Sequence, residues 1–284
     1  MRMKARILTT MLALAAGLSA CSGDSPESLL AAAKTEIEKK DSKAAIIQLK
    51  NALQLNPSLA EARFLLGKLL LESGDAVGAA VELGKAQQLD APPAQVAPLL
   101  ARAMLMQGQS DRVISTFATT ELKSPAADAE LRVSVASAYA MRGKQAEAEK
   151  MLASALRADP ENVAAGLLKA RLLLRQREIP AAQELLDKLA STGAGNAEAW
   201  QIKGDLLLES GKTEEAIAAY RQALQRDKRN LAAHTALLWS LIGSKDMAAA
   251  KTALEAMKQA LPSNPSTKLF EGVVALENGD LKAA

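Results

Sequence analysis

The sequence predicts an all-α solenoid built from antiparallel helix pairs, and three observations lead to this prediction. From Pro26 onward the chain repeats every 34 residues, with one inserted residue near Asp128. Small, large and turn-forming residues recur at fixed positions of each unit. Apolar residues make up 49% of the chain but aromatic residues only 2%, a balance typical of helices that pack closely through Ala and Gly.

The first twenty residues form an export signal. Arg2, Lys4 and Arg6 precede a short apolar stretch that ends in Leu-Ser-Ala-Cys at Cys21. This ending resembles the lipobox of bacterial lipoproteins, which implies that the chain is cut before Cys21 and that its thiol carries a lipid. Each buried methylene would contribute about 0.8 kcal/mol, so the resulting anchor would be stable. The alternative is an ordinary signal peptide with a chance Cys.

Ser22 follows Cys21, and in the lipoprotein sorting rule this favours the outer membrane over the inner membrane. We therefore divide the chain into a signal peptide (1–20), a short tether (21–25) and the solenoid (26–284). The solenoid units begin at Pro26, Ala60, Ala94, Ala129, Val163, Ala197, Leu231 and Pro265. The last unit stops at its position 20 without a polar cap, so we expect the chain to be the N-terminal part of a longer repeat protein.

Each unit has the same sequence plan. Positions 8 and 20 are nearly always Ala or Gly, which lets the two helices of a unit approach closely, and position 24 is a large apolar residue that fills the space beside them. Position 15 is Gly in five units, where a left-handed residue can end the first helix. Position 32 is Pro in four units and ends the second helix. Pro98 lies early in one first helix, which we expect it to delay or kink.

This plan resembles the tetratricopeptide repeat. The sixth unit, Ala197 to Asn230, matches most of that signature through Trp200, Gly204, Leu207, Ala216, Tyr220 and Ala223. The resemblance implies a right-handed superhelix of about seven and a half repeats whose concave groove binds protein or peptide partners.

A narrower resemblance covers Ser25 to Asp75 behind the lipobox. This stretch is similar to the tetratricopeptide-repeat lipoproteins of the PEP-CTERM/exosortase system, which implies a role in exopolysaccharide or surface-protein export. The alternatives are a lipoprotein of outer-membrane protein or pilus assembly, and an enzyme whose catalytic domain lies beyond residue 284.

Composition excludes several kinds of chemistry. One Cys rules out a disulfide framework, and one His, His234, gives no metal cluster or catalytic triad, so we expect no cofactor and no metal. Seven aromatic residues are too few for stacking along a nucleic acid. The net charge of +3 comes from the three basic residues of the signal, because removing them leaves 35 − 3 = 32 basic against 32 acidic residues. We expect no enzyme activity and no nucleic-acid binding.

Binding residues are predicted on the first helix of each unit. Position 9 carries Lys34, Lys68, Arg102 and Arg171, with Trp239 further along, and position 13 adds Arg175. Position 2 carries mostly Glu, and position 5 adds Phe64, Leu30 and Leu167 as apolar contacts. The pattern predicts a groove for an extended peptide or an acidic polymer. The competing interpretation is a solvated helix face copied by duplication, and direct polysaccharide contact is left open.

Overall fold

The computed structural model describes residues 25–191 and 197–279, and over these residues the chain forms fifteen α-helices and no strand. The first helices of the units are α1 (Pro26–Glu38), α3 (Ala60–Glu72), α5 (Pro93–Met106), α7 (Pro125–Met141), α9 (Val163–Arg175), α11 (Ala197–Glu209), α13 (Leu231–Gly243) and α15 (Pro265–Glu277). The second helices are α2 (Ser42–Leu55), α4 (Ala76–Gln88), α6 (Ser110–Phe117), α8 (Gln145–Ala158), α10 (Ile179–Ser191), α12 (Thr213–Arg226) and α14 (Met247–Ala260). The predicted all-α solenoid of helix pairs is confirmed.

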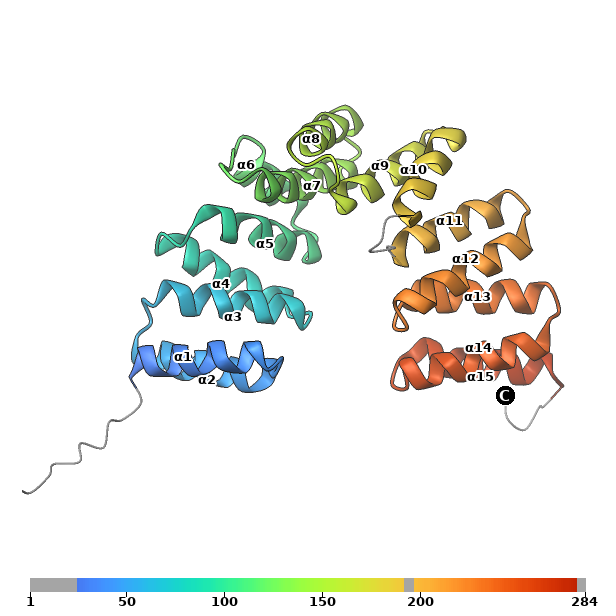
Figure 1. Cartoon of the computed structure of the whole chain (residues 1–284), viewed down its shortest axis with the longest axis horizontal. Coiled ribbons are helices and arrows are strands. Elements are labelled where there is room, and N and C mark those ends of the chain that lie inside the picture. Colours follow the sequence, from blue (N-terminus) through green and yellow to red (C-terminus); the bar gives the residue numbers. More distant parts are fainter. Residues whose placement is uncertain (1–24, 192–196, 280–284) are drawn as a thin grey trace, which may run out of the picture.

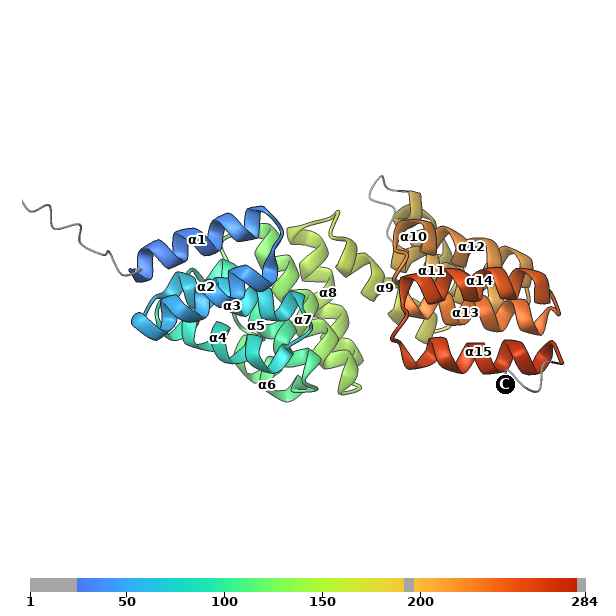
Figure 2. The ribbon, with the colours of Figure 1, turned by 90° about the horizontal axis from the view of Figure 1, so that it is seen from below.

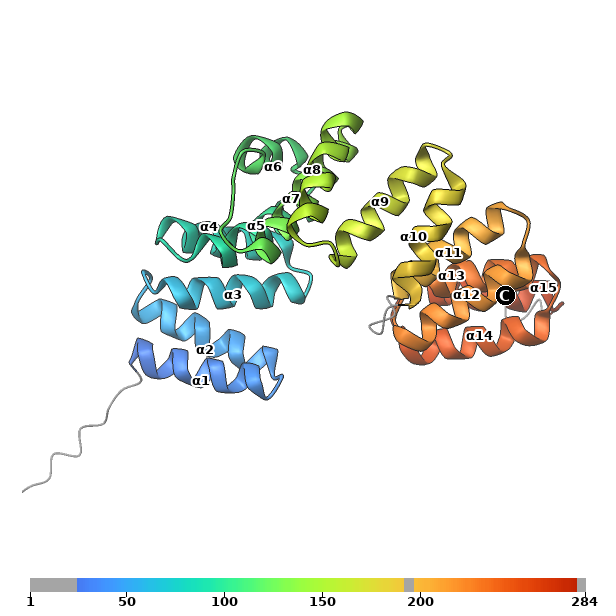
Figure 3. The same ribbon diagram turned by 45° about the horizontal axis from the view of Figure 1, so that its top comes forward.

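The helices stack into an arch. In Figure 1, α1–α5 form one arm and α11–α15 the other, and α6–α10 join the two arms at the top. Figures 2 and 3 show the chain passing from one arm to the other between α8 and α9. The buried side chains form several separate clusters along the stack, because each helix makes its main contacts with helices one or two places away in the chain.

The small-residue columns lie where the sequence plan puts them. At position 8, Ala33 and Ala170 are fully buried, and at position 20 the same holds for Ala45 and Ala182. The large residues of position 24 fill the space between the helices, from Leu49 to Tyr220. Close packing through Ala and Gly therefore explains why so few aromatic residues suffice for the core.

The turn between the two helices of a unit requires a left-handed residue at position 15. The five glycines predicted there all have positive φ, for example +88° at Gly74 and +76° at Gly211. The three units without Gly keep the same backbone with Lys40, Arg177 and Lys245, whose φ values are +62°, +64° and +62°. The turn is thus a property of the unit, and three units maintain it in a conformation that side chains disfavour.

Polar caps fix the starts of many helices. Asp41, Asp75 and Asp246 follow the left-handed residue and accept a hydrogen bond from a backbone N–H of the second helix. Asn162 and Asn230 do the same for first helices, each at 2.9 Å. These caps satisfy N–H groups that have no partner within the helix.

Two local departures concern the third and fourth units. Pro98 lies inside α5, which begins at Pro93 and continues without a break to Met106, so the expected delay of this helix is wrong. Pro93 itself opens the helix, because a proline at the first position needs no N–H partner. α7 begins at Pro125, four residues before Ala129, and with 17 residues it is the longest helix in the described part of the chain.

The signal peptide, the tether as far as residue 24 and Cys21 lie outside the described residues. Lipid attachment at Cys21 therefore stays a prediction. None of the helices described in residues 25–279 combines the length and apolar character needed to cross a membrane.

Candidate functional site

The candidate site is the exposed surface of the first helices, which we call the first-helix face and define by position 9 of each unit. Lys34, Lys68, Arg102, Arg171 and Trp239 are all exposed. They occupy consecutive or near-consecutive first helices, whereas their neighbours at position 8 are buried against the second helices. The alternation of exposed and buried residues follows from the helical period, which turns the chain by about 100° per residue.

Two members of the basic series are neutralised by acidic residues of the following unit. Lys34 Nζ lies 2.6 Å from Glu61 Oε1, which joins α1 to α3. Arg171 forms the equivalent ion pair with Glu198 and joins α9 to α11. In these two places, position 9 of one unit pairs with position 2 of the next. Both pairs are about half-exposed, so each contributes at most about 1 kcal/mol to stability.

The central members of the series remain unneutralised within the described residues. Lys68 on α3 faces a unit whose position 2 is Gln95, so the acidic partner is replaced by a neutral residue. Arg102 on α5 and Arg175 on α9 are also exposed and form no ion pair with a described residue. Lys68 and Arg102 lie on α3 and α5, two first helices that contact each other. On the first-helix face, Lys68 and Arg102 thus place two positive charges, unpaired in the described part of the chain, next to each other in the N-terminal arm.

The predicted apolar contacts are only partly present on this face. Trp239 is 52% exposed, and its ring packs edge-on against Phe270 of α15 with a centroid distance of 5.1 Å. Phe64 is half-buried and packs against the core around α4 and α5, while Leu30 and Leu167 are buried. Position 5 lies three residues before the buried position 8 and so shares its side of the helix. The expectation that position 5 points into the groove is wrong for Leu30 and Leu167.

A polar cluster in the sixth unit was not predicted. The Tyr220 hydroxyl donates to Asp205 Oδ1 at 2.9 Å, and the Gln201 side chain donates to the other carboxylate oxygen. Tyr220 belongs to the large-residue column, so its sequence position suggested packing alone. Burial raises the pKa of Asp205, with Glu209 adding to the shift, while the hydrogen bond from Tyr220 and the charge of Arg171 act in the opposite direction. The same burial and the neighbouring Asp205 raise the pKa of the Tyr220 hydroxyl far above its ordinary value.

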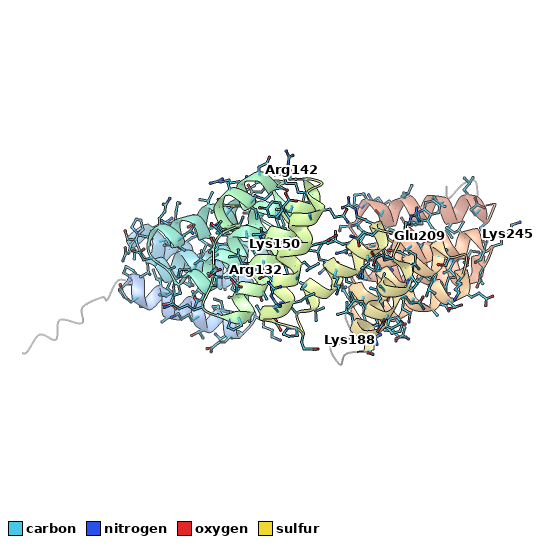
Figure 4. The ribbon with its side chains drawn as sticks, turned by 90° about the horizontal axis from the view of Figure 1, so that it is seen from above. Arg132, Arg142, Lys150, Lys188, Glu209 and Lys245 are labelled. Atoms are coloured by element: carbon cyan, nitrogen blue, oxygen red, sulfur yellow. The ribbon has the colours of Figure 1, made fainter. Side chains whose placement is uncertain are left out.

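Charged side chains elsewhere are arranged as local structural pairs. Figure 4 labels Arg132, Arg142 and Lys188, whose pairs lie on different parts of the arch. Arg132 contacts Asp128 at 2.5 Å within α7, and Arg142 contacts Asp111 at 2.9 Å between α7 and α6. Lys188 lies 3.6 Å from Glu161. Each pair is local, either within one helix or between neighbouring segments, and the three do not converge on one site.

The described residues hold no candidate metal site. No cluster of three or more His, Cys, Asp or Glu side chains that could hold a metal lies in them. His234 is 2% exposed, and its Nε2 lies 2.9 Å from the carbonyl oxygen of Lys228. Because a carbonyl oxygen can only accept, Nε2 carries the proton and donates. His234 thus has a structural hydrogen bond on one side of its ring.

Comparisons with known proteins agree with this architecture. Family models described as tetratricopeptide repeat match residues 30–94, 139–206 and 207–268. No curated protein matches the chain. Tetratricopeptide repeats serve as protein-interaction scaffolds, and the matches indicate no catalytic family.

Solved structures share the fold at low sequence identity. A tetratricopeptide repeat protein from Parabacteroides merdae has a TM-score of 0.66 at 16% identity, covering 90% of this chain and 100% of that one. The APC/C hetero-tetramer Cut9-Hcn1 gives a TM-score of 0.61 at 17% identity, covering 88% of this chain and 48% of the other. PilF of Pseudomonas aeruginosa gives 0.48 at 16% identity, with coverage of 79% and 86%. With family models matching well over half of its residues, the chain belongs to the tetratricopeptide repeat family.

Proposed function

We propose that this protein is a non-catalytic scaffold that binds an extended, acidic segment of a partner protein along the first-helix face of its N-terminal arm. The observation that carries the proposal is the pair Lys68 and Arg102. Both are exposed on adjacent first helices and lack an ionic partner among the described residues, whereas Lys34 and Arg171 are neutralised. An unpaired basic pair on a rigid stack attracts acidic side chains and fixes their spacing.

The binding proposal is tested by reversing these two charges in the full-length protein. We expect K68E/R102E to reduce crosslinking to partners in the host by about tenfold, because two attractive contacts become repulsive. The matched control is K43E/K150E, which makes the same charge change on the exposed surfaces of α2 and α8. Circular dichroism checks the fold of both variants. Equal loss in the two double variants, or no loss in K68E/R102E, would contradict the proposal.

We further propose that the scaffold is lipid-anchored through Cys21 in the outer membrane, faces the periplasm and serves exopolysaccharide or PEP-CTERM surface export. Support comes from the lipobox ending at Cys21, from Ser22 behind it and from the resemblance of residues 25–75 to lipoproteins of that system. Replacing Cys21 with Ala should move the protein from the membrane fraction to the soluble fraction. Continued membrane association of C21A would refute the lipid anchor, without bearing on the first-helix face.

The export role has a separate test. Deleting the gene should reduce surface exopolysaccharide or the display of PEP-CTERM proteins, and the wild-type gene should restore it. If the gene encoding K68E/R102E restored export as completely as the wild-type gene, the first-helix face would have no part in that role.

A further inference from the structure

A recess lies between the second helices α12 and α14, with α13 as its floor. The three helices belong to the C-terminal arm (Figure 1). We call it the α12–α14 groove. Its volume is about 1050 Å³, about twice that of the recess at the equivalent place between α2 and α4, which is about 500 Å³. Leu237 and Leu241 form the apolar floor, and both are buried apart from the small area that faces the groove.

The groove is wide because the seventh unit lacks side chains that occupy the corresponding places in the second and sixth units. In the second unit, Arg63 at position 4 pairs with Glu82 at position 23, with Nη1 and Oε2 2.6 Å apart. In the sixth unit, the guanidinium of Arg226 at position 30 covers the Trp200 ring at position 4, 5.2 Å from its centroid. The seventh unit has His234 at position 4, but Ala253 at position 23 and Ala260 at position 30.

These substitutions belong to a stripe of small residues along one wall. Ala249, Ala253, Ala256 and Ala260 all line the groove at spacings of four, three and four residues, so they share one face of α14. At 1.5 Å per residue the stripe is about 16 Å long, or three helical turns. A wall of methyl groups lets a second helix approach closely, because helix separation depends on the side chains at the contact.

His234 supplies an independent sign that the groove accepts a ligand. Its side chain lines the groove and is almost completely buried, and Nδ1 has no hydrogen-bond partner among the described residues. Nε2 is already occupied by the Lys228 carbonyl. A buried ring nitrogen without a partner is unfavourable. Because Nε2 carries the proton, Nδ1 can only accept, so a ligand gains the corresponding free energy where it brings a donor, such as a hydroxyl or amide side chain, to this ring.

The charge of the groove selects the kind of ligand. Arg221, Lys228 and Arg229 line it, none of them forms an ion pair with a described residue, and no carboxylate side chain lines it. The recess between α2 and α4 differs, since Asp75 and Glu82 line it. The α12–α14 groove is therefore apolar along its floor and positive around its edge in a chain that is otherwise nearly neutral.

We propose that the α12–α14 groove binds an acidic amphipathic helix of a partner protein. Apolar residues at positions i, i+3, i+4 and i+7 would rest on Leu237, Leu241 and the alanine stripe, and acidic residues would face the three basic side chains. Trp239 lies two residues, about 200°, from Leu237 around α13, so the first-helix face and this groove are on opposite sides of that helix. The proposal is independent of the proposed function, and both surfaces can be occupied at once.

The partner is unidentified, so the probe is a phage-displayed library of 16-residue peptides selected on the purified full-length protein. The A253E variant serves for counter-selection, since it places in the groove the residue that the second unit carries there. We expect the enriched peptides to be acidic and to show apolar residues at helical spacing. The proposal would be overturned if the enriched peptides were basic or lacked apolar residues at helical spacing. It would also be overturned if no enriched peptide bound wild type better than A253E.

Affinity measurements on variants complete the test. The affinity of a selected peptide is measured by fluorescence polarisation. A253E should weaken this affinity at least tenfold by filling the groove. R221Q/R229Q should weaken it at least tenfold by removing positive charge while the groove stays open. The matched control is A248E, which adds the same charge to an exposed position of α14 outside the groove and should change affinity less than twofold. Equal effects of A253E and A248E would refute a groove site. Binding of dodecanoate by a groove that selects no peptide would assign it to anionic amphiphiles and refute a helical ligand.

Discussion

Gly204 permits the tightest helix approach in the sixth unit, and replacing it with Ala tests the packing argument. A Cβ atom on Gly204 would lie 2.4 Å from Cε1 and 2.6 Å from Cδ1 of Tyr220, closer than carbon atoms can approach. Tyr220 is completely buried and its hydroxyl is held by Asp205, so the ring cannot move aside freely. The added methyl group must therefore separate α11 from α12.

The expected cost follows from three contributions. Overpacking costs about 1–3 kcal/mol. Loss of the Tyr220–Asp205 hydrogen bond adds about 1.5–3 kcal/mol if the ring is displaced. The better helix propensity of Ala returns about 0.5–1 kcal/mol. Together these contributions lead us to expect G204A to lower the free energy of unfolding by about 1.5–5.5 kcal/mol.

The assay is guanidinium denaturation followed by tryptophan fluorescence, because Trp200 lies one turn from Gly204 in α11. Gly84 is the matched control, since it lies inside α4 and a Cβ there would meet nothing within 4 Å, so G84A should be neutral or stabilising. G204A/Y220L recreates the Ala–Leu combination of the first unit, Ala33 with Leu49, and should recover part of the loss. A G204A protein as stable as the wild type would refute the steric argument.

Three further predictions concern stability. Replacing Arg177 with Gly should raise the free energy of unfolding by about 0.5–1 kcal/mol, because a backbone φ of +64° is unfavourable for any residue with a Cβ atom. An unchanged denaturation midpoint would contradict this. Truncating Arg63 to Ala should lower the free energy of unfolding by about 1.5–3 kcal/mol, since Glu82 is only 13% exposed and keeps just its longer 3.3 Å pair with Lys85. Hydrogen exchange in α3 and α4 reports the loss, and unchanged protection there would contradict the prediction. Burial raises the pKa of Asp205 in the folded state, so the folded protein binds this proton more tightly than the unfolded chain and the group's contribution falls as the pH rises through that pKa. The stability of D205N relative to wild type should therefore increase as the pH rises above the ordinary Asp pKa of 3.8, and a difference independent of pH would exclude this cause.

The fold was largely predictable because the determinants repeat. A fixed spacing of small, large and turn residues over eight units specifies which helix faces are buried, and Ala45, Leu49 and Gly74 behave as their columns require. The starts of α5 and α7 were less predictable, because Pro93 and Pro125 open these helices ahead of the unit boundaries.

The candidate site was only partly predictable, since its chemistry depends on contacts between units. Position 9 identified the exposed basic residues, but pairing of Lys34 with Glu61 depends on how neighbouring first helices are placed. The α12–α14 groove had a sequence signal in the alanine spacing of α14. His234 gave no such signal in the sequence. Its burial and the lack of a described partner for Nδ1 depend on which side chains the packed helices bring next to its ring.

The separation of the core into clusters along the arch has a mechanical consequence. Substantial helix contacts join elements no more than two places apart in the chain, so no long loop must close before a contact can form. Such a stack extends and refolds a unit at a time, and tension applied at one end is resisted by single interfaces in series. When pulled, the molecule should lengthen in steps of about one repeat, acting as a spring between whatever holds its ends.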